Sequence, residues 1–254
     1  MDELQILKSR LLDLAQKAYK QNIYTYTGFL NAGELAILDT LRDELNFVDY
    51  RTNGGYDLAE RQMVRFGSEE MFGYDEPWHI SILKLEPLMD KFADELSHRD
   101  FLGAIMNLGL ERNVLGDIVI KNKKRAFIIC QDNMTEYLME NLIKVKHTNV
   151  RCTIAEPEQD LCELRPQLLN INVIVSAPRF DAIMAAAIKC SRSEALSLFR
   201  SGKVTLNGRL CENNSMQLKE GDIFSARGYG KFKYEGCGSL TRKGRIYVHL
   251  MQYV

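Results

Sequence analysis

Apolar residues recur at helical spacing in the first part of the chain. Over residues 2–20 they keep an i, i+3/i+4 rhythm, which predicts an amphipathic helix. A second helix is predicted over residues 32–45, because Asn31 and Glu34 have the spacing of a capping box ahead of a leucine stripe. Residues 47–50 are compatible with a short strand.

The middle of the chain alternates between strand and helix patterns. Strands are predicted where apolar residues run for five to eight positions, and helices where the apolar spacing returns to three or four. The predicted elements are a strand at 78–85, a helix at 98–109, strands at 116–120 and 125–130, a helix at 135–143 and a strand at 149–154. This β-α-β-β-α-β order is typical of a ferredoxin-like, RRM-like sandwich.

The last part of the chain contains sequence signals for two helices, a helix end and a hairpin turn, in that order. An apolar stripe beginning at Phe180 predicts one helix, and the capping box of Ser191 and Glu194 begins a second. Gly202 stands where that helix would end in a left-handed residue. Asn207-Gly208 is a strong hairpin-turn signal. Strands are predicted at 170–175, 204–206, from 209 onward, 223–227, 231–234 and 246–250.

These patterns predict an α+β protein of three domains. We expect an N-terminal α-rich domain at 1–76, an RRM-like domain at 77–155, a linker with a connecting strand at 156–175, and a C-terminal domain at 176–254. The connecting strand could lead into the last domain or pack on either one.

The composition is that of an ordinary globular protein. Of the 254 residues, 46% are hydrophobic and 26% are charged. No run approaches the roughly 20 apolar residues of a membrane helix, and the first residues lack the basic and apolar regions of a signal peptide. The six cysteines never form C-x-x-C and have no histidine at zinc spacing. We therefore expect a cytoplasmic protein with reduced thiols, no metal and no cofactor.

The net charge of −1 hides an asymmetry. Residues 176–254 contain 13 Lys and Arg against 6 Asp and Glu, whereas residues 1–175 contain 20 against 28. A basic C-terminal domain on an acidic body indicates that this domain meets a polyanion.

The predicted helix that begins after Ser191 has features of an anion site. Arg192 falls in the first turn, where the helix dipole is already positive, so the position favours an external anion such as phosphate. An ordinary solvated basic face is the alternative. The predicted nucleic-acid contacts are Arg179, Ser191, Arg192, Ser193, Arg200, Lys203, Asn207 and Arg209.

The same stretch resembles the S4 RNA-binding domain. The resemblance is carried by Pro178-Arg179-Phe180-Asp181, Ser191-Arg192-Ser193-Glu194-Ala195, Gly202-Lys203-Val204, the turn ending at Gly208, and Lys219-Glu220-Gly221-Asp222. The family's opening R-L-D-x-x-L reads Arg179-Phe180-Asp181 followed by Met184 here, a conservative departure. The resemblance implies two short helices on a small sheet, with the second helix start and the following hairpin facing RNA.

The whole chain is similar to the YlmH family of bacterial S4-domain proteins. Besides the S4 module, the similarity rests on Phe29-Leu30-Asn31, Gly54-Gly55-Tyr56, Ala59-Glu60-Arg61, His98-Arg99-Asp100-Phe101-Leu102-Gly103-Ala104 and Gly116-Asp117-Ile118. It implies a cytoplasmic protein that binds ribosomal RNA and tRNA on the large ribosomal subunit and serves ribosome-associated quality control by rescuing stalled nascent chains. A gene-neighbourhood link to cell division also belongs to the family. Off the ribosome we expect a monomer.

Secondary RNA contacts are predicted at two basic places. One is the hairpin tip with Lys123, Lys124 and Arg125, and the other is the strand with Lys231 and Lys233. A solvated turn is the alternative for the hairpin tip. Base stacking on the middle sheet has little support, because Phe127 is the one aromatic residue on its two central predicted strands.

No catalytic motif accompanies these features. Nucleotide-binding glycine fingerprints are absent, and neighbouring helical residues such as those at 98–100 do not face one another. We therefore expect no enzyme activity. The alternative is an RNA-modifying enzyme of the pseudouridine synthase or methyltransferase type, to which S4 domains are often appended. A protein partner docking on the acidic N-terminal part is compatible with RNA binding.

Overall fold

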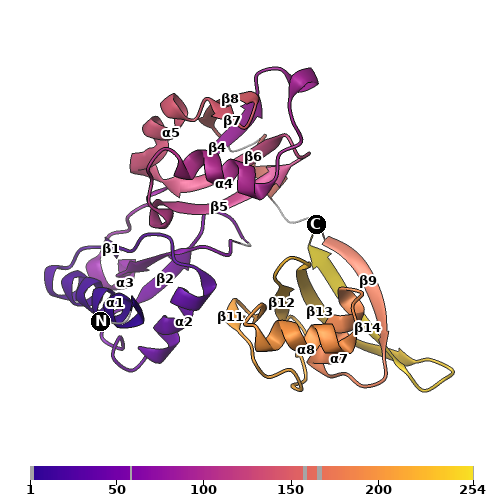
Figure 1. Ribbon diagram of the computed structural model, residues 1–254. Helices are drawn as coiled ribbons and strands as arrows, with labels where there is room; N and C mark the ends of the chain where they lie inside the picture. The colour runs from indigo at the N-terminus through magenta and orange to yellow at the C-terminus, as the bar shows by residue number, and fades with distance from the viewer. Residues whose placement is uncertain (1–2, 58, 157–158, 165–167, 254) are drawn as a thin grey trace. The chain divides into compact units, whose positions relative to one another are not determined.

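The computed structural model describes residues 3–57, 59–156, 159–164 and 168–253, and the chain divides into two compact units, residues 1–165 and 166–254 (Figure 1). The first unit contains an N-terminal region and a middle region, and the second contains the C-terminal region. Each unit is described by itself.

The N-terminal region combines helices with a small antiparallel sheet. Its elements are α1 (Glu3–Gln21), β1 (Thr25–Tyr26), α2 (Ala32–Thr40), β2 (Tyr50–Asn53), β3 (Met63–Phe66) and α3 (Glu69–Phe72), with strand order β1-β3-β2. The capping box predicted at the start of α2 is present. The helix ends earlier than predicted, and residues 41–47 continue as turns that keep Leu41 and Leu45 in the core. The predicted strand at 47–50 was wrong, since β2 begins only at Tyr50.

The middle region has the predicted β-α-β-β-α-β order of elements. These are β4 (Ile80–Pro87), α4 (His98–Met106), β5 (Leu115–Lys121), β6 (Arg125–Gln131), α5 (Thr135–Asn141) and β8 (Thr148–Ile154). A two-residue strand β7 (Lys144–Val145) extends the antiparallel sheet, whose order is β5-β6-β4-β8-β7. One face of the sheet packs on α4 and α5, through buried residues such as Phe101 and Leu138.

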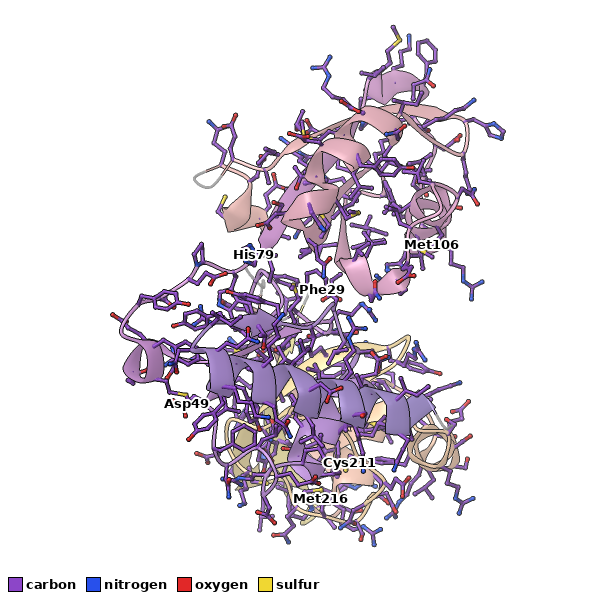
Figure 2. All side chains as sticks on the ribbon, turned by 90° about the vertical axis from the view of Figure 1, so that its left-hand side faces the viewer. Phe29, Asp49, His79, Met106, Cys211 and Met216 are labelled. Atoms are coloured by element: carbon purple, nitrogen blue, oxygen red, sulfur yellow. The ribbon has the colours of Figure 1, made fainter. Side chains whose placement is uncertain are left out.

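The other face of this sheet is covered over β6 by the N-terminal region and the segment after β8, whereas Asn149 and Arg151 of β8 are exposed. Phe29 and Met63 pack on Ile129, while Ala155 and Leu164 pack on Phe127. Phe127 is only 2% exposed, so it has no free ring face for a base. In Figure 2 the labelled Phe29 lies between the N-terminal and middle regions.

Glycine allows this close approach of backbone to sheet. A Cβ atom on Gly116 would lie 2.9 Å from both Ile129 Cγ2 and Phe29 Cε1, and one on Gly28 would lie 2.7 Å from the Asn113 carbonyl oxygen. Larger residues at these two positions would force the layers apart.

The second unit has helices on one face of a six-stranded antiparallel sheet (Figure 1). Its elements are β9 (Leu168–Val175), α7 (Phe180–Ala187), α8 (Arg192–Arg200), β10 (Val204–Leu206), β11 (Arg209–Leu210), β12 (Ile223–Ala226), β13 (Gly230–Leu240) and β14 (Ile246–Tyr253). The sheet order is β11-β10-β12-β13-β14-β9. The connecting strand β9 pairs with β14 along its whole length, so it forms an edge of this sheet.

Gly116→Ala should destabilise the first unit by about 1–3 kcal/mol, because the added methyl group overpacks the layer between Ile129 and Phe29. Gly103→Ala is the matched control. Gly103 lies inside α4 with open space around its Cα, so alanine should stabilise by roughly 0.5–1 kcal/mol. The measurement is denaturant unfolding followed by fluorescence of Trp78, the single tryptophan, which lies in this unit. Equal stability of the two variants would contradict the close packing.

Candidate functional site

A buried carboxylate at the start of α7 holds two arginines. Asp181 is 1% exposed and accepts hydrogen bonds from Arg179 Nε and Nη2 at 3.2 and 3.1 Å. Arg192, at the start of α8, donates to Asp181 Oδ2 through Nε and Nη2 at 3.2 and 3.1 Å. The arginine side chains remain 41% and 55% exposed. This group, the Arg179–Asp181–Arg192 cluster, carries a net charge of +1 and presents two oriented guanidinium groups to solvent.

The loop after β11 fixes the backbone beneath the cluster. The amides of Phe180 and Asp181 donate to the carbonyl oxygens of Met216 and Asn214 at 3.0 and 2.9 Å. Cys211 Sγ lies 3.7 Å from Met216 Sδ, and Figure 2 shows the two sulfur side chains together. The position of Asp181 is therefore set by backbone contacts from a distant segment.

The charge state of Asp181 follows from this environment. Burial alone would raise the pKa of its carboxyl group, but hydrogen bonds and positive charge from Arg179 and Arg192 outweigh burial, so the pKa lies below its usual value. The carboxylate is ionised at neutral pH and can orient both guanidinium groups.

The N-terminus of α8 is capped as predicted. Ser191 Oγ accepts from the Glu194 amide at 3.2 Å, and Glu194 Oε2 accepts from the Ser191 amide at 2.8 Å. Ser193 Oγ lies 3.0 Å from Ser191 Oγ on the exposed surface. The Ser191 hydroxyl is thus engaged in the cap beside Arg192, and the Glu194 carboxylate partly offsets the helix dipole there.

The other predicted contacts lie at the far end of α8 and on the hairpin. Arg200 is eight residues beyond Arg192, about 12 Å along the helix. Lys203 is exposed. Its backbone amide donates a hydrogen bond to the Leu198 carbonyl oxygen, and Gly202 at φ 63° completes a Schellman motif at the C-terminus of α8. These two basic residues therefore stand apart from the cluster.

The predicted hairpin turn is formed by Asn207 and Gly208, both at positive φ. The Asn207 amide group donates to Asp222 Oδ1 at 2.9 Å and accepts from the Ile223 amide at 2.9 Å. These bonds tie the turn to the next strand and occupy the Asn207 side chain. The backbone of Arg209 begins β11, and its side chain lies outside the described part of the structure.

The predicted secondary contacts have local partners. Lys123 pairs with Glu95 at 3.0 Å, and Lys124 with Asp90 at 3.4 Å. Arg125 lies near two carboxylates, and Lys233 pairs with a glutamate at 2.7 Å. Exposed pairs of this kind are weak, so they lower the local positive charge without fixing the side chains.

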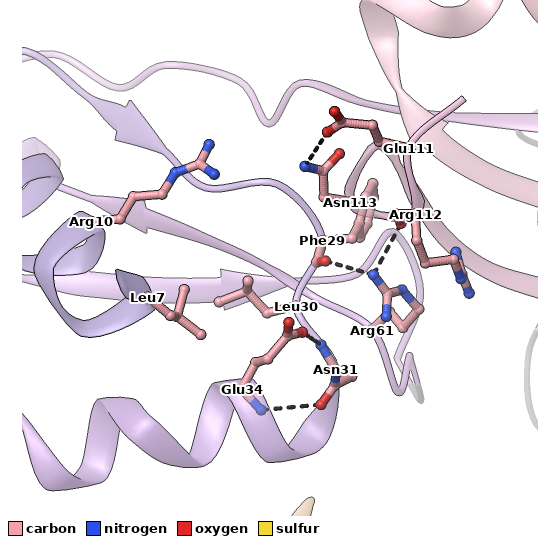
Figure 3. A pocket seen from close by; sticks show the side chains of 10 residues that line it. All are labelled: Leu7, Arg10, Phe29, Leu30, Asn31, Glu34, Arg61, Glu111, Arg112 and Asn113. Atoms are coloured by element: carbon pink, nitrogen blue, oxygen red, sulfur yellow. Dashed lines mark hydrogen bonds between the residues drawn. The ribbon is translucent and has the colours of Figure 1, made fainter. Parts of the chain in front are cut away.

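A hollow of about 380 Å³ lies in the first unit beside two further arginines (Figure 3). Arg61 donates to the carbonyl oxygens of Phe29, Arg112 and Leu115, and Arg112 donates to those of Leu115 and Gly116. Arg61 therefore ties three backbone segments together. Burial and the Arg61 charge lower the pKa of Arg112 to about 10, which still leaves it charged at neutral pH.

The carboxylate of Asp100 caps the start of α4. Asp100 Oδ2 accepts from the amide and hydroxyl of Ser97 at 2.7 and 2.6 Å and pairs with Lys146 at 2.9 Å. The Ser97 hydrogen bonds lower the pKa of Asp100 to about 2. The six cysteines are free thiols, and the described residues contain no group of three or more metal-ligating His, Cys, Asp or Glu.

Two family models match this chain. One is the S4 domain, over residues 178–224, which includes the whole cluster. The other is described as "Putative RNA-binding domain in YlmH" and covers residues 75–159, the middle region. The chain is therefore similar to the YlmH family of S4-domain proteins.

Proteins of known name are also similar to this chain. The ribosome-associated protein quality control protein P2 of Bacillus subtilis (strain 168) is 26% identical over 235 residues, covering 91% of this chain and 87% of that protein. The solved structure of cell division protein ylmH from Streptococcus pneumoniae is 20% identical with a TM-score of 0.49, covering 61% of this chain and 93% of that one. Among the described residues no helix is long and apolar enough to span a membrane.

Asp181 is the residue of the Arg179–Asp181–Arg192 cluster that sequence reasoning missed. It stood in the Arg179-Phe180-Asp181 motif, but its role was not inferred because its second partner, Arg192, is eleven residues away on another helix. A signal for this role was available in the sequence. An acidic residue follows one arginine by two positions, and another arginine stands at the start of the next helix.

Asp181→Asn should weaken the unit in a pH-dependent way. The folded pKa of Asp181 lies below the unfolded value of about 3.9, so its stabilisation is present above pH 4 and is lost as the pH falls through the folded pKa. Hydrogen exchange of peptides from α7 and α8 should be faster in the variant at pH 7, and the difference should shrink near pH 2. A difference that does not depend on pH would contradict the role of the charge.

Proposed function

We propose that this chain is a non-catalytic RNA-binding protein that contacts ribosomal RNA and tRNA on the large ribosomal subunit during the rescue of stalled nascent chains. The single observation that carries the proposal is the Arg179–Asp181–Arg192 cluster. A buried carboxylate orients two exposed guanidinium groups, which is the arrangement that suits bidentate contact with phosphate oxygens.

Charge and shape support RNA as the ligand. The basic residues of the C-terminal part outnumber its acidic ones by seven, and Arg200 and Lys203 add positive charge at the far end of α8. Phosphate contacts position a protein on RNA without reading its sequence, so selectivity would come from the shape of the RNA. The matched S4 domain and the name of the Bacillus subtilis relative support the ribosome as the place of binding.

The remaining parts of the proposal concern the rest of the chain. The middle region, matched by the second RNA-binding model, would touch RNA through its loops and edges, since helices cover one face of its sheet and the N-terminal region covers β6 on the other. The acidic N-terminal region would meet a protein partner. The protein would be cytoplasmic and monomeric off the ribosome.

The proposal is tested by sedimentation of the full-length protein with purified large ribosomal subunits at low and moderate salt. Wild type should co-migrate with the subunit, more strongly at low salt. Arg192→Glu should lower the bound fraction at least tenfold, because it replaces an oriented positive charge beside Asp181 with a second negative one.

Arg242→Glu is the matched control. It makes the same charge change in the same unit, on an exposed turn between β13 and β14 that is remote in sequence from the cluster. This variant should keep most of the binding. Equal loss in both variants would show that only total charge matters, and wild type that stays in the free fraction would overturn the ribosome proposal. Binding of a methyl-donor cofactor would instead favour an RNA-modifying enzyme.

A further inference from the structure

The sheet of the second unit has one face that no described element of that unit covers. The helices α7 and α8 lie on the other face, where Val248 and Leu250 of β14 point into the core (Figure 1). Side chains alternate along a strand, so Tyr247, Tyr253 and the two odd-numbered residues between them point away from the helices. The strand therefore carries a row of rings on the uncovered side.

The strand register places basic and apolar side chains beside this row. Tyr253 stands between Lys231 of β13 and Leu168 of β9, and Met251 stands opposite Lys233. Lys231 Nζ lies 5.9 Å from the centre of the Tyr253 ring, within the range of a cation–π contact. The ring of Tyr253 on β14 thus lies beside a lysine of β13 on one side and the apolar Leu168 of β9 on the other.

His249 lies close against the sheet in the middle of the row. Its Nδ1 is 2.6 Å from Asn172 Oδ1 on β9. A Cβ atom on Gly238 of β13 would come within 2.4 Å of His249 Nε2, so the imidazole occupies the space that a side chain would take there. Glycine at 238 makes room for this ring, and the ring reaches from one neighbouring strand to the other.

We propose that this open face, formed by Tyr247, His249, Tyr253, Lys231 and Lys233, binds single-stranded RNA by base stacking. Exposed rings accept bases of any sequence, and adjacent lysines neutralise the phosphates between them. Glu235, a carboxylate on the same stretch of β13, is paired with Lys233 at 2.7 Å, so this pair adds no net charge to the face. The inference rests on the proposed function, because it takes RNA as the ligand.

The open face and the Arg179–Asp181–Arg192 cluster lie on opposite sides of one sheet. The cluster belongs to the helix side and suits phosphates of a structured RNA, whereas the open face suits unpaired bases. The unit can therefore hold two RNA segments at once, one by its backbone and one by its bases.

The test uses the full-length protein and two probes, an unstructured oligouridylate and an RNA duplex, in fluorescence anisotropy. Tyr247→Ala and Tyr253→Ala should each weaken oligouridylate binding about tenfold, with an unchanged salt slope because no charge is removed. Tyr247→Phe keeps the ring and should bind like wild type. Tyr229→Ala removes an exposed tyrosine from the turn between β12 and β13 and should have no effect.

Photocrosslinking of a 4-thiouridine oligomer to the wild-type protein needs no variant and separates the two sites. Crosslinks in peptides of β13 and β14 support the open face, whereas crosslinks confined to α7 and α8 overturn it. Failure of the proposed function would appear differently, as subunit binding that Arg192→Glu leaves intact. Loss of oligouridylate binding in Tyr229→Ala as well, or no response in either open-face alanine variant, would also overturn the inference and leave this face to a protein partner.

Discussion

The hydrogen bonds from Arg179 and Arg192 to the buried Asp181 carboxylate are the interaction on which the second unit depends. They join the starts of α7 and α8, so the same contact that fixes the helix pair also aims two guanidinium groups at solvent. Backbone bonds from the loop at 214–216 hold the carboxylate in place. Preorganised arginines lose less freedom on binding phosphate than free ones, and stability and recognition are therefore coupled at this point.

The two units use their sheets in opposite ways. In the first unit one sheet face is buried under α4 and α5, and the other is buried over β6 under the N-terminal region, with Gly116 and Gly28 permitting the close contact. In the second unit only the helix-covered face is buried. The net charge follows the same division, because residues 1–175 contain 20 Lys and Arg against 28 Asp and Glu, whereas residues 176–254 contain 13 against 6.

Local signals carried most of what could be predicted from sequence. The capping boxes at Asn31 and Ser191 and the turn at Asn207-Gly208 act within a few residues, and all three are present. The partners of Asp181 could not be read in this way, since they come from other elements. The burial of β6 on both faces could also have been predicted from the sequence. Its unbroken apolar run from Ala126 to Cys130 is typical of a strand that is buried on both faces.

The measurement that tests the central claim most directly is the affinity of Arg192→Lys for the large ribosomal subunit as a function of salt. Lysine keeps the positive charge. Its single ammonium group cannot donate two parallel hydrogen bonds to Asp181 and at the same time present further oriented N–H groups to a phosphate. The account predicts roughly tenfold weaker binding with the same salt slope, and little change for Arg200→Lys, which has no such anchor. Wild-type affinity in Arg192→Lys would show that charge alone suffices and would contradict the account.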